Sequence, residues 1–435
     1  MLSLFFHFRS MLFFHMNIKN IFFATTLYTL IGKVLLLVQG VIIARVLTVS
    51  DFGLYSYLMS IMNLIGIPVM AGLHPYILKV LSDSIKNNNH KEINTILNST
   101  FLYITLMSIA IITISKVLSE FYDSEYYSNI IIISFIIYIR ALQNRINSVM
   151  YSFSSPLFAI VPQLIITPAI VVCATILANC FYSLSYIEVL HYILLGLTVS
   201  LCFSLVKTNS LMKSASIRRK IKISKFKISE ISPYILFYAI TMSNNEILVL
   251  LVESLFSSQE VAYYKVAFSS AVLLTITTQI INSFLANIIT STSNKIDLQK
   301  KITIISRFNS VFVTLIFMML FIFSKPIISF VYGKQYEPMV DVFEVLLIGF
   351  WLSSLYCSVS MLLNMNGGVK YASKSFFISL VTIIVSSLIL VPFFELLGIA
   401  ISQAVGLLVS SISMNHYLKV TYGINSLPIL NKRLV

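Results

Sequence analysis

The sequence alternates long apolar runs with short polar segments. A helix that spans a bilayer needs roughly 20 mostly apolar residues, and by this measure the sequence predicts twelve spans. The six expected in the first half are 19–45, 54–81, 95–118, 127–151, 156–180 and 186–207. The six expected in the second half are 231–254, 262–290, 303–324, 338–364, 372–393 and 397–418. The pattern therefore predicts an all-α integral membrane fold.

A repeated segment divides these spans into two sets. Residues 33–57 consist of an apolar helix, a break near Thr48–Asp51 and the start of a second apolar helix, and residues 242–265 form a weaker copy. Aligning Gly53 with Ala262, an offset of 209 residues, also aligns Asp51 with Glu260. Repeats of this kind are typical of secondary transporters. Because six spans precede the second copy, we expect two six-helix bundles that are parallel repeats.

The pattern also gives the expected domain organisation. Residues 1–18 read as an interfacial segment, or as an extension ahead of a start at Met16, and Lys207–Ser229 is the longest polar stretch. The expected parts are an N-terminal segment at 1–18, a six-helix bundle at 19–207, a basic cytoplasmic linker at 208–230, a second six-helix bundle at 231–418 and a cytoplasmic tail at 419–435.

Composition and charge agree with a membrane protein. Hydrophobic residues make up 58% of the chain and charged residues 11%, whereas a soluble domain is about 25% charged. The net charge of +14 comes from bases in short loops, as the positive-inside rule describes, so we expect no nucleic-acid partner. Most lysines and arginines fall on one side, which places both termini in the cytoplasm. The exceptions are Lys33, Arg45, Lys116, Lys265, Lys325 and Lys334.

No pattern in the sequence indicates covalent chemistry. The four cysteines lie in apolar runs without CxxC or His/Cys metal spacing, and we expect no metal and no cofactor. Phosphate loops ending in GKS or GKT, HExxH and GxSxG are absent. The loops between spans are too short to fold as catalytic domains, which disfavours an integral-membrane enzyme of glycan assembly. The sequence therefore predicts a transporter and not an enzyme.

The region from Gly40 to Ser82 resembles the start of bacterial polysaccharide-biosynthesis flippases of the Wzx type. These belong, with multidrug (MATE) exporters and lipid II flippases, to one exporter superfamily (MOP). The matching positions, in order, are Ala44, Arg45, Asp51, Phe52, Gly53, Tyr55, Gly72, Leu73 and Lys79. The segment Phe323–Pro338 is similar to the family's loop between its ninth and tenth helices.

This resemblance implies a function. It implies alternating access that moves an undecaprenyl-pyrophosphate-linked oligosaccharide, an O-antigen, capsule or exopolysaccharide unit, across the bacterial cytoplasmic (inner) membrane. The implied partners are that lipid-linked oligosaccharide, a proton or sodium ion as coupling ion, membrane lipids and the polysaccharide polymerase machinery. The alternative within the superfamily is a multidrug or other small-molecule exporter.

Two intramembrane charges are the main candidates for transport. A charge at the centre of a transmembrane helix costs about 2.5–3.5 kcal/mol on insertion scales. Lys33 and Glu246 lie at similar depth, about 21 and 22 Å along equivalent spans at ~1.5 Å per residue. We expect them to face one polar cavity, with Lys33 attracting a pyrophosphate or acidic sugar and Glu246 pairing with it or taking the coupling ion. A static structural ion pair is the alternative.

Other polar residues are candidates for substrate contact, each with a structural alternative. Arg45 and Lys265 border the outer ends of spans, where they either anchor the interface or contact substrate, and Arg140 and Arg145 lie near the inner end of the fourth span. Amide side chains suit either sugar hydroxyls or hydrogen bonds between helices. They are Gln39, Asn63, Gln163, Gln279, Asn282, Asn287 and Gln403. His74 is a further titratable group, and Pro68, Pro75, Pro162 and Pro168 are expected helix bends.

Overall fold

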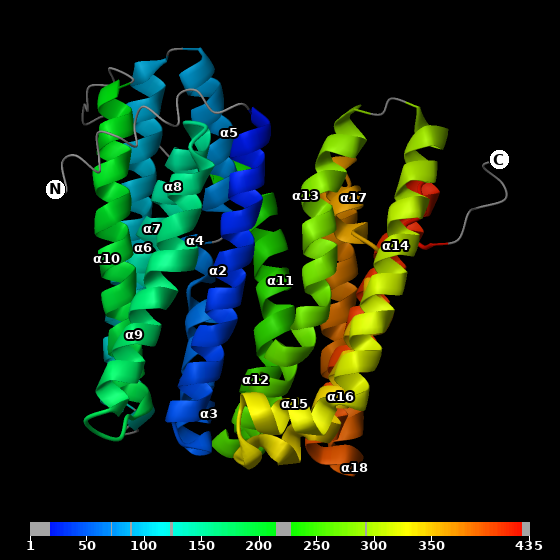
Figure 1. The fold of residues 1–435 in the computed structure, drawn as a ribbon. Coiled ribbons are helices and arrows are strands. Elements are labelled where there is room, and N and C mark those ends of the chain that lie inside the picture. The colour runs from blue at the N-terminus through cyan, green and yellow to red at the C-terminus, as the bar shows by residue number, and fades with distance from the viewer. Residues whose placement is uncertain are drawn as a thin grey trace. The chain divides into compact units, whose positions relative to one another are not determined.

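The computed structural model describes residues 18–70, 72–87, 89–121, 125–214, 228–291 and 294–428. Within these ranges every regular element is a helix (Figure 1). The chain divides into two compact units, one formed by residues 1–43 and 73–231 and the other by residues 44–72 and 232–435. The predicted all-α class is confirmed.

The first unit is built on long helices from the first half of the chain. They are α2 (Ile18–Val46, whose last three residues belong to the second unit), α5 (Leu73–Lys86), α6 (His90–Phe121), α7 (Glu125–Ser152), α8 (Pro156–Val161), the π-helix η1 (Pro162–Ile166), α9 (Thr167–Asn179) and α10 (Tyr186–Ser214). Helix α7 packs against α5, α6 and α10, and it forms the centre of this unit.

The second unit contains the remaining helices. They are α3 (Val49–Ile65), α4 (Ile67–Met70), α11 (Ile228–Leu255), α12 (Ser258–Ala271), η2 (Val272–Thr275), α13 (Ile276–Ser291), α14 (Lys295–Ile322), α15 (Ser324–Val331), η3 (Lys334–Met339), α16 (Val340–Ser354), α17 (Val359–Met365), α18 (Val369–Tyr417) and the π-helix η4 (Leu418–Tyr422). Helix α12 packs against both α3 and α16, and α16 packs against α18.

The helices reproduce the predicted spans. Ten of those in the described residues are long and apolar enough to cross a membrane, and the pair formed by Val49–Ile65 and Ile67–Lys86 makes eleven when it is counted as one span. One of the ten, Val369–Tyr422, is 54 residues long, and it contains both of the last two predicted spans. Twelve predicted spans are thus accounted for.

Helix α18 is a tight hairpin and not one straight rod. Glu395 adopts φ 48° and ψ −127°, which breaks the helix at this point. On either side of the break the two arms pack antiparallel, since Ser379 Oγ donates to Gly406 O at 2.7 Å and Ser375 Oγ donates to Ser413 Oγ at 3.0 Å. A Cβ at Gly398 would lie 2.7 Å from Leu390 O, so glycine allows this close turn.

The compact units group one segment differently from the predicted bundles. Residues 44–72, which the sequence placed in the 19–207 bundle, cluster with residues 232–435. The reason is the packing of α3 on α12, where the backbones meet at Gly53: a Cβ there would lie 1.6 Å from Ser258 O. Glycine at position 53 therefore permits a contact that a larger residue would prevent.

The predicted tail begins as part of the second unit. Gln299 Nε2 donates to Asn425 O at 3.0 Å, and Ser306 Oγ donates to Ser426 O at 2.6 Å. Both Asn425 and Ser426 are buried, so the chain packs onto α14 after α18. The predicted segment 1–18 lies almost wholly outside the described residues, as do 215–227 of the predicted linker and residues 429–435.

Candidate functional site

The candidate site is built around the carboxylate of Glu246. This residue lies on α11, within the candidate membrane span Ile235–Leu255, and only 7% of its surface is exposed. A carboxylate in such a place must be paired and hydrogen-bonded, because burial of an isolated charge is strongly unfavourable. The second unit supplies these partners from two further helices.

Both carboxylate oxygens of Glu246 are engaged. Lys265 Nζ on α12 lies 3.0 Å from Oε2 and forms an ion pair with it. The Ser60 hydroxyl donates to Oε2 at 2.7 Å, and Asn63 Nδ2 donates to Oε1 at 2.8 Å, both from α3. One buried carboxylate thus joins α3, α11 and α12, and we call Glu246, Lys265, Ser60 and Asn63 the carboxylate cluster.

The cluster gives Glu246 a cationic partner that was not assigned to it from the sequence. The cation beside Glu246 is Lys265, which was predicted to be an interface anchor or a substrate contact. Lys33 lies on α2 in the first unit, where it is half-buried. Its predicted pairing with Glu246 stays a prediction, while the pairing of Glu246 with a lysine on the neighbouring helix is a feature of the structure.

Local hydrogen bonds explain how α3 and α12 are positioned. Thr48 caps α3: its hydroxyl accepts from Asp51 N at 3.1 Å and donates to Asp51 Oδ2 at 2.8 Å. Ser257 is the N-cap residue of α12, and its hydroxyl donates to the Glu260 carboxylate but accepts no bond from the helix backbone. The offset that aligns Gly53 with Ala262 also aligns these two capping pairs. N-cap side chains of this kind fix where a helix begins.

Arg45 holds the segment that follows α15. Its Nε donates to Val331 O at 2.7 Å, and a second guanidinium nitrogen donates to Phe330 O. The Tyr336 hydroxyl donates to Ala44 O at 3.1 Å. The two segments that carry the sequence resemblance, near Arg45 and at 323–338, therefore contact each other, and Arg45 acts here as a cap on the α15 carbonyl groups.

The remaining predicted residues have varied surroundings. Arg145 on α7 donates to Thr100 Oγ1 at 3.1 Å and to Leu97 O at 2.6 Å, so α6 occupies its guanidinium. Gln279 Nε2 donates to Thr275 Oγ1, one helical turn earlier in the chain, at 3.0 Å. The Asn282 amide oxygen is buried with no hydrogen-bond partner among the described residues. Gln39 on α2 and Arg140 on α7 are half-buried.

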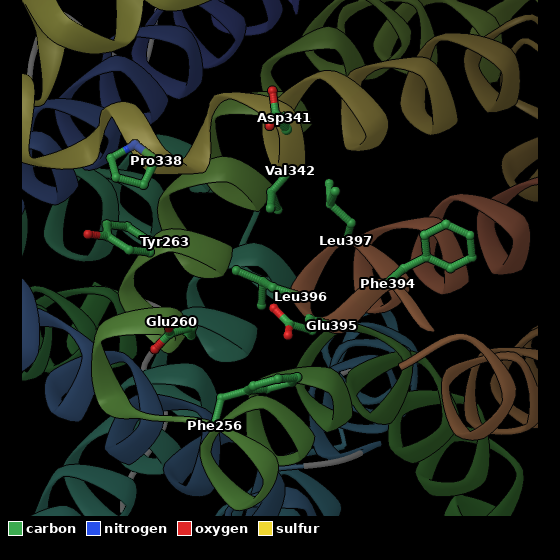
Figure 2. Close-up of a pocket in the computed structure, with 10 residues that line it drawn as sticks. All are labelled: Phe256, Glu260, Tyr263, Pro338, Asp341, Val342, Phe394, Glu395, Leu396 and Leu397. Carbon is green, nitrogen blue, oxygen red and sulfur yellow. The ribbon is translucent and has the colours of Figure 1, made fainter. Parts of the chain in front are cut away.

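A pocket of about 260 Å³ lies where the N-terminal ends of α12 and α16 meet the turn of α18 (Figure 2). It is lined by Phe256, Glu260, Tyr263, Pro338, Asp341, Val342, Phe394, Glu395, Leu396 and Leu397. Three carboxylates and three aromatic rings thus surround it, and no residue of the carboxylate cluster is among them. Within the described part of the chain, no group of three or more His, Cys, Asp or Glu side chains is arranged to hold a metal ion.

Sequence comparison places the chain in a known family. The sequence model of the family described as "Polysaccharide biosynthesis protein" matches residues 42–341. The chain belongs to this family. The matched region includes Arg45, Asp51, Gly53 and the 323–338 segment, so the resemblance drawn from these residues is confirmed. No curated protein matches the chain in sequence.

Solved structures share the fold of this chain. An inward-facing multidrug resistance MATE family transporter of the MOP superfamily has a TM-score of 0.73 at 10% identity, covering 90% of this chain and 94% of the other. Lipid II flippase MurJ in an inward closed conformation has a TM-score of 0.72 at 15% identity, covering 91% and 87%. The Vibrio cholerae MATE transporter VcmN has a TM-score of 0.62 at 13% identity, covering 92% and 97%. The chain therefore has the fold of multi-pass membrane transporters.

Part of this site was not predicted from the sequence. Ser60 was not singled out, and Asn63 was noted only as one of several amides, although both bind Glu246. The signal for Lys265 was present: α11 ends at Leu255 and α12 begins at Ser258, so Glu246 and Lys265 lie at comparable distances from one turn. Two charges at equal distances from the turn of a helical hairpin lie at the same level along the two helices.

Proposed function

We propose that this polysaccharide biosynthesis protein is a flippase. Its substrate is an undecaprenyl-pyrophosphate-linked oligosaccharide, the repeat unit of an O-antigen, capsule or exopolysaccharide, which it moves from the cytoplasmic to the outer leaflet of a bacterial cytoplasmic membrane. Family membership supports a role in polysaccharide assembly, and the transporter fold supports translocation as that role. The positive-inside pattern supports cytoplasmic termini.

The observation that carries this proposal furthest is the carboxylate cluster. A buried glutamate and lysine in apolar helices are expensive to insert into a membrane and by default indicate a functional site. Here the glutamate also links α3 to the α11–α12 hairpin through Ser60, Asn63 and Lys265. An ion that binds this carboxylate therefore acts directly on the contact between helices.

The cluster suggests how ion binding is coupled to movement. A proton on Glu246 removes the negative charge that holds Lys265, and a sodium ion bound to Glu246 competes with Lys265 for that charge. Either ion also weakens the hydrogen bonds that Ser60 and Asn63 donate to the carboxylate. The α3 segment is then less firmly held against α11 and α12. In this proposal Glu246 is the ion-coupling residue, and Lys265 releases it and pairs with it again in each cycle.

Substrate recognition is assigned to the cationic and amide residues of the two units. Lys33 attracts the pyrophosphate, and Arg140 lies near the inner end of its span, where the substrate enters. Gln39, Gln279 and Asn282 offer hydrogen bonds to sugar hydroxyls. Arg45 and Arg145 act mainly as positioning residues, because backbone carbonyl groups occupy their guanidinium groups.

Deletion of the encoding gene tests the flippase function. We expect the deletion strain to accumulate lipid-linked glycan in the cytoplasmic leaflet, and expression of the wild-type chain to remove it. Glu246→Gln should fail to complement the deletion. The matched control is Glu253→Gln on the same helix, where the carboxylate accepts a hydrogen bond from Ser258 Oγ at 2.9 Å, and this variant should complement. A deletion strain with drug hypersensitivity and normal glycan would instead establish the alternative, a multidrug exporter.

A further inference from the structure

A chain of hydrogen-bonded amides crosses the interior of the first unit. Gln143 on α7 donates from Nε2 to Ser204 Oγ on α10 at 2.8 Å and to Asn147 Oδ1 at 3.0 Å. Asn147 Nδ2 then donates to Gln163 Oε1 on η1 at 2.8 Å. Gln143, Asn147 and Ser204 are almost fully buried, and Gln163, the last residue of this hydrogen-bonded series, is half-buried.

The direction of this amide chain determines what Gln163 can offer a ligand. Gln143 uses its N–H groups toward Ser204 and Asn147, while its oxygen has no donor among the described residues. Asn147 in turn donates to the Gln163 oxygen, which leaves the Gln163 amide nitrogen as the end of the series. No described residue accepts a hydrogen bond from that nitrogen. The orientation of the Gln163 amide is thus fixed by its hydrogen bond from Asn147, and its N–H group points away from that bond.

The backbone around Gln163 is specialised to hold this orientation. Residues Pro162–Ile166 form a π-helix between α8 and α9, and such segments occur often at functional sites. Pro162 has no N–H to bond to the preceding turn, and its carbonyl accepts from Thr167 Oγ1 at 3.1 Å. The widened turn is therefore stabilised by its own side chains as well as by Asn147.

Gln163 also lies close to the helix that carries Lys33. A Cβ at Gly32 would lie 2.5 Å from Leu164 Cβ and 3.0 Å from Leu164 O, so the backbones of α2 and η1 touch at this point. Lys33 and Gln163 are the residues adjacent to this contact. The first unit thus has a cation and a neutral donor next to the contact between α2 and η1.

We infer that Gln163 binds the saccharide part of the substrate through its amide N–H, beside the pyrophosphate that Lys33 attracts. This inference rests on the proposed flippase function. A lysine matches a pyrophosphate because it is a compact charge. A neutral amide N–H held in one direction by a second amide is suited to a neutral oxygen at a defined position. A sugar hydroxyl and an acetamido carbonyl are such oxygens.

Two variants of similar size test the donor. Gln163→Met removes the donor and adds no charge beside the pyrophosphate. Asn147→Asp presents only acceptors, so Gln163 must turn its N–H inward and present its oxygen. Binding is measured with purified protein in lipid nanodiscs and two probes: the lipid-linked glycan extracted from the deletion strain, and undecaprenyl pyrophosphate without sugar.

We expect both variants to bind the glycan lipid about three- to tenfold more weakly, as for loss of one hydrogen bond, and to bind undecaprenyl pyrophosphate as the wild type does. The control Asn129→Asp changes a buried asparagine on the same helix, which donates to Tyr186 Oη at 3.0 Å, and should bind both probes normally. Unchanged glycan binding in both variants, or equal weakening for both probes, would overturn the inference. If the wild type itself does not bind the glycan lipid, the proposed function fails and the donor role fails with it.

Discussion

Lys265 Nζ lies 3.0 Å from Glu246 Oε2, and the two residues are on consecutive helices, α11 and α12. The pair is largely buried, with side-chain exposures of 20% and 9%. Ser60 and Asn63 complete the hydrogen bonds of the carboxylate. Because each charge compensates the other inside apolar helices, the two residues should respond to mutation as a unit.

Removal of one partner should cost more stability than removal of both. Lys265→Met leaves a buried carboxylate without its counter-charge, and loss of one member of a buried pair typically costs about 3–5 kcal/mol. The double variant Lys265→Met/Glu246→Gln removes the charge as well, so we expect it to recover most of that loss. Thermal unfolding of the purified proteins measures this, and the double variant should still fail to complement the deletion strain.

The exposed pair formed by Lys325 and Glu337 provides the control for this experiment. Its atoms are 3.5 Å apart, and the lysine side chain is 69% exposed. Such pairs contribute about 0–1 kcal/mol, so Lys325→Met should leave the unfolding temperature nearly unchanged. A double variant at 246 and 265 that is no more stable than Lys265→Met would contradict the coupling of the buried pair.

The contact of α3 with α12 should depend on the absence of a side chain at Gly53. A Cβ at this position would lie 1.6 Å from Ser258 O, and backbone has little freedom to move away. We expect Gly53→Ala to separate the helices, to lower the free energy of unfolding by about 1–3 kcal/mol and to reduce glycan export. Gly40→Ala is the matched control, since nothing lies within 4 Å of its added Cβ. Equal unfolding temperatures for the two variants would refute this explanation.

Much of the fold could be predicted from the sequence because its signals are local. The apolar runs set the spans, and the polar break before Asp51 set the boundary between α2, which ends at Val46, and α3, which begins at Val49. The repeat was visible because Gly53 and Asp51 align with Ala262 and Glu260 at one offset. In the structure, Thr48 and Ser257 precede the two equivalent helices, and each hydroxyl donates to the acidic residue three positions later. Capping depends on residues within one turn of the chain, so a sequence displays it directly.

The partners of Glu246 were harder to predict because they depend on packing. The equivalence of the two repeats predicted Lys33 as a partner of Glu246, and this stays a prediction. The partner in the structure, Lys265, lies on the adjacent helix of a hairpin. Ser60 reaches the carboxylate only because α3 packs closely on α12 at Gly53. No periodicity within α3 indicates that contact, since it depends on two helices about two hundred residues apart in the chain.

The last prediction concerns Arg45 as the cap of α15. Its guanidinium donates to two consecutive carbonyl groups, Val331 O and Phe330 O, and a lysine ammonium cannot reproduce this planar two-point geometry. We therefore expect Arg45→Lys to lower the unfolding temperature and to expose the 323–338 segment to limited proteolysis, nearly as much as Arg45→Met does. Lys334→Met, an exposed cation in that same segment, should change neither measurement. Full protection in Arg45→Lys would show that charge alone, and not the paired hydrogen bonds, holds the segment in place.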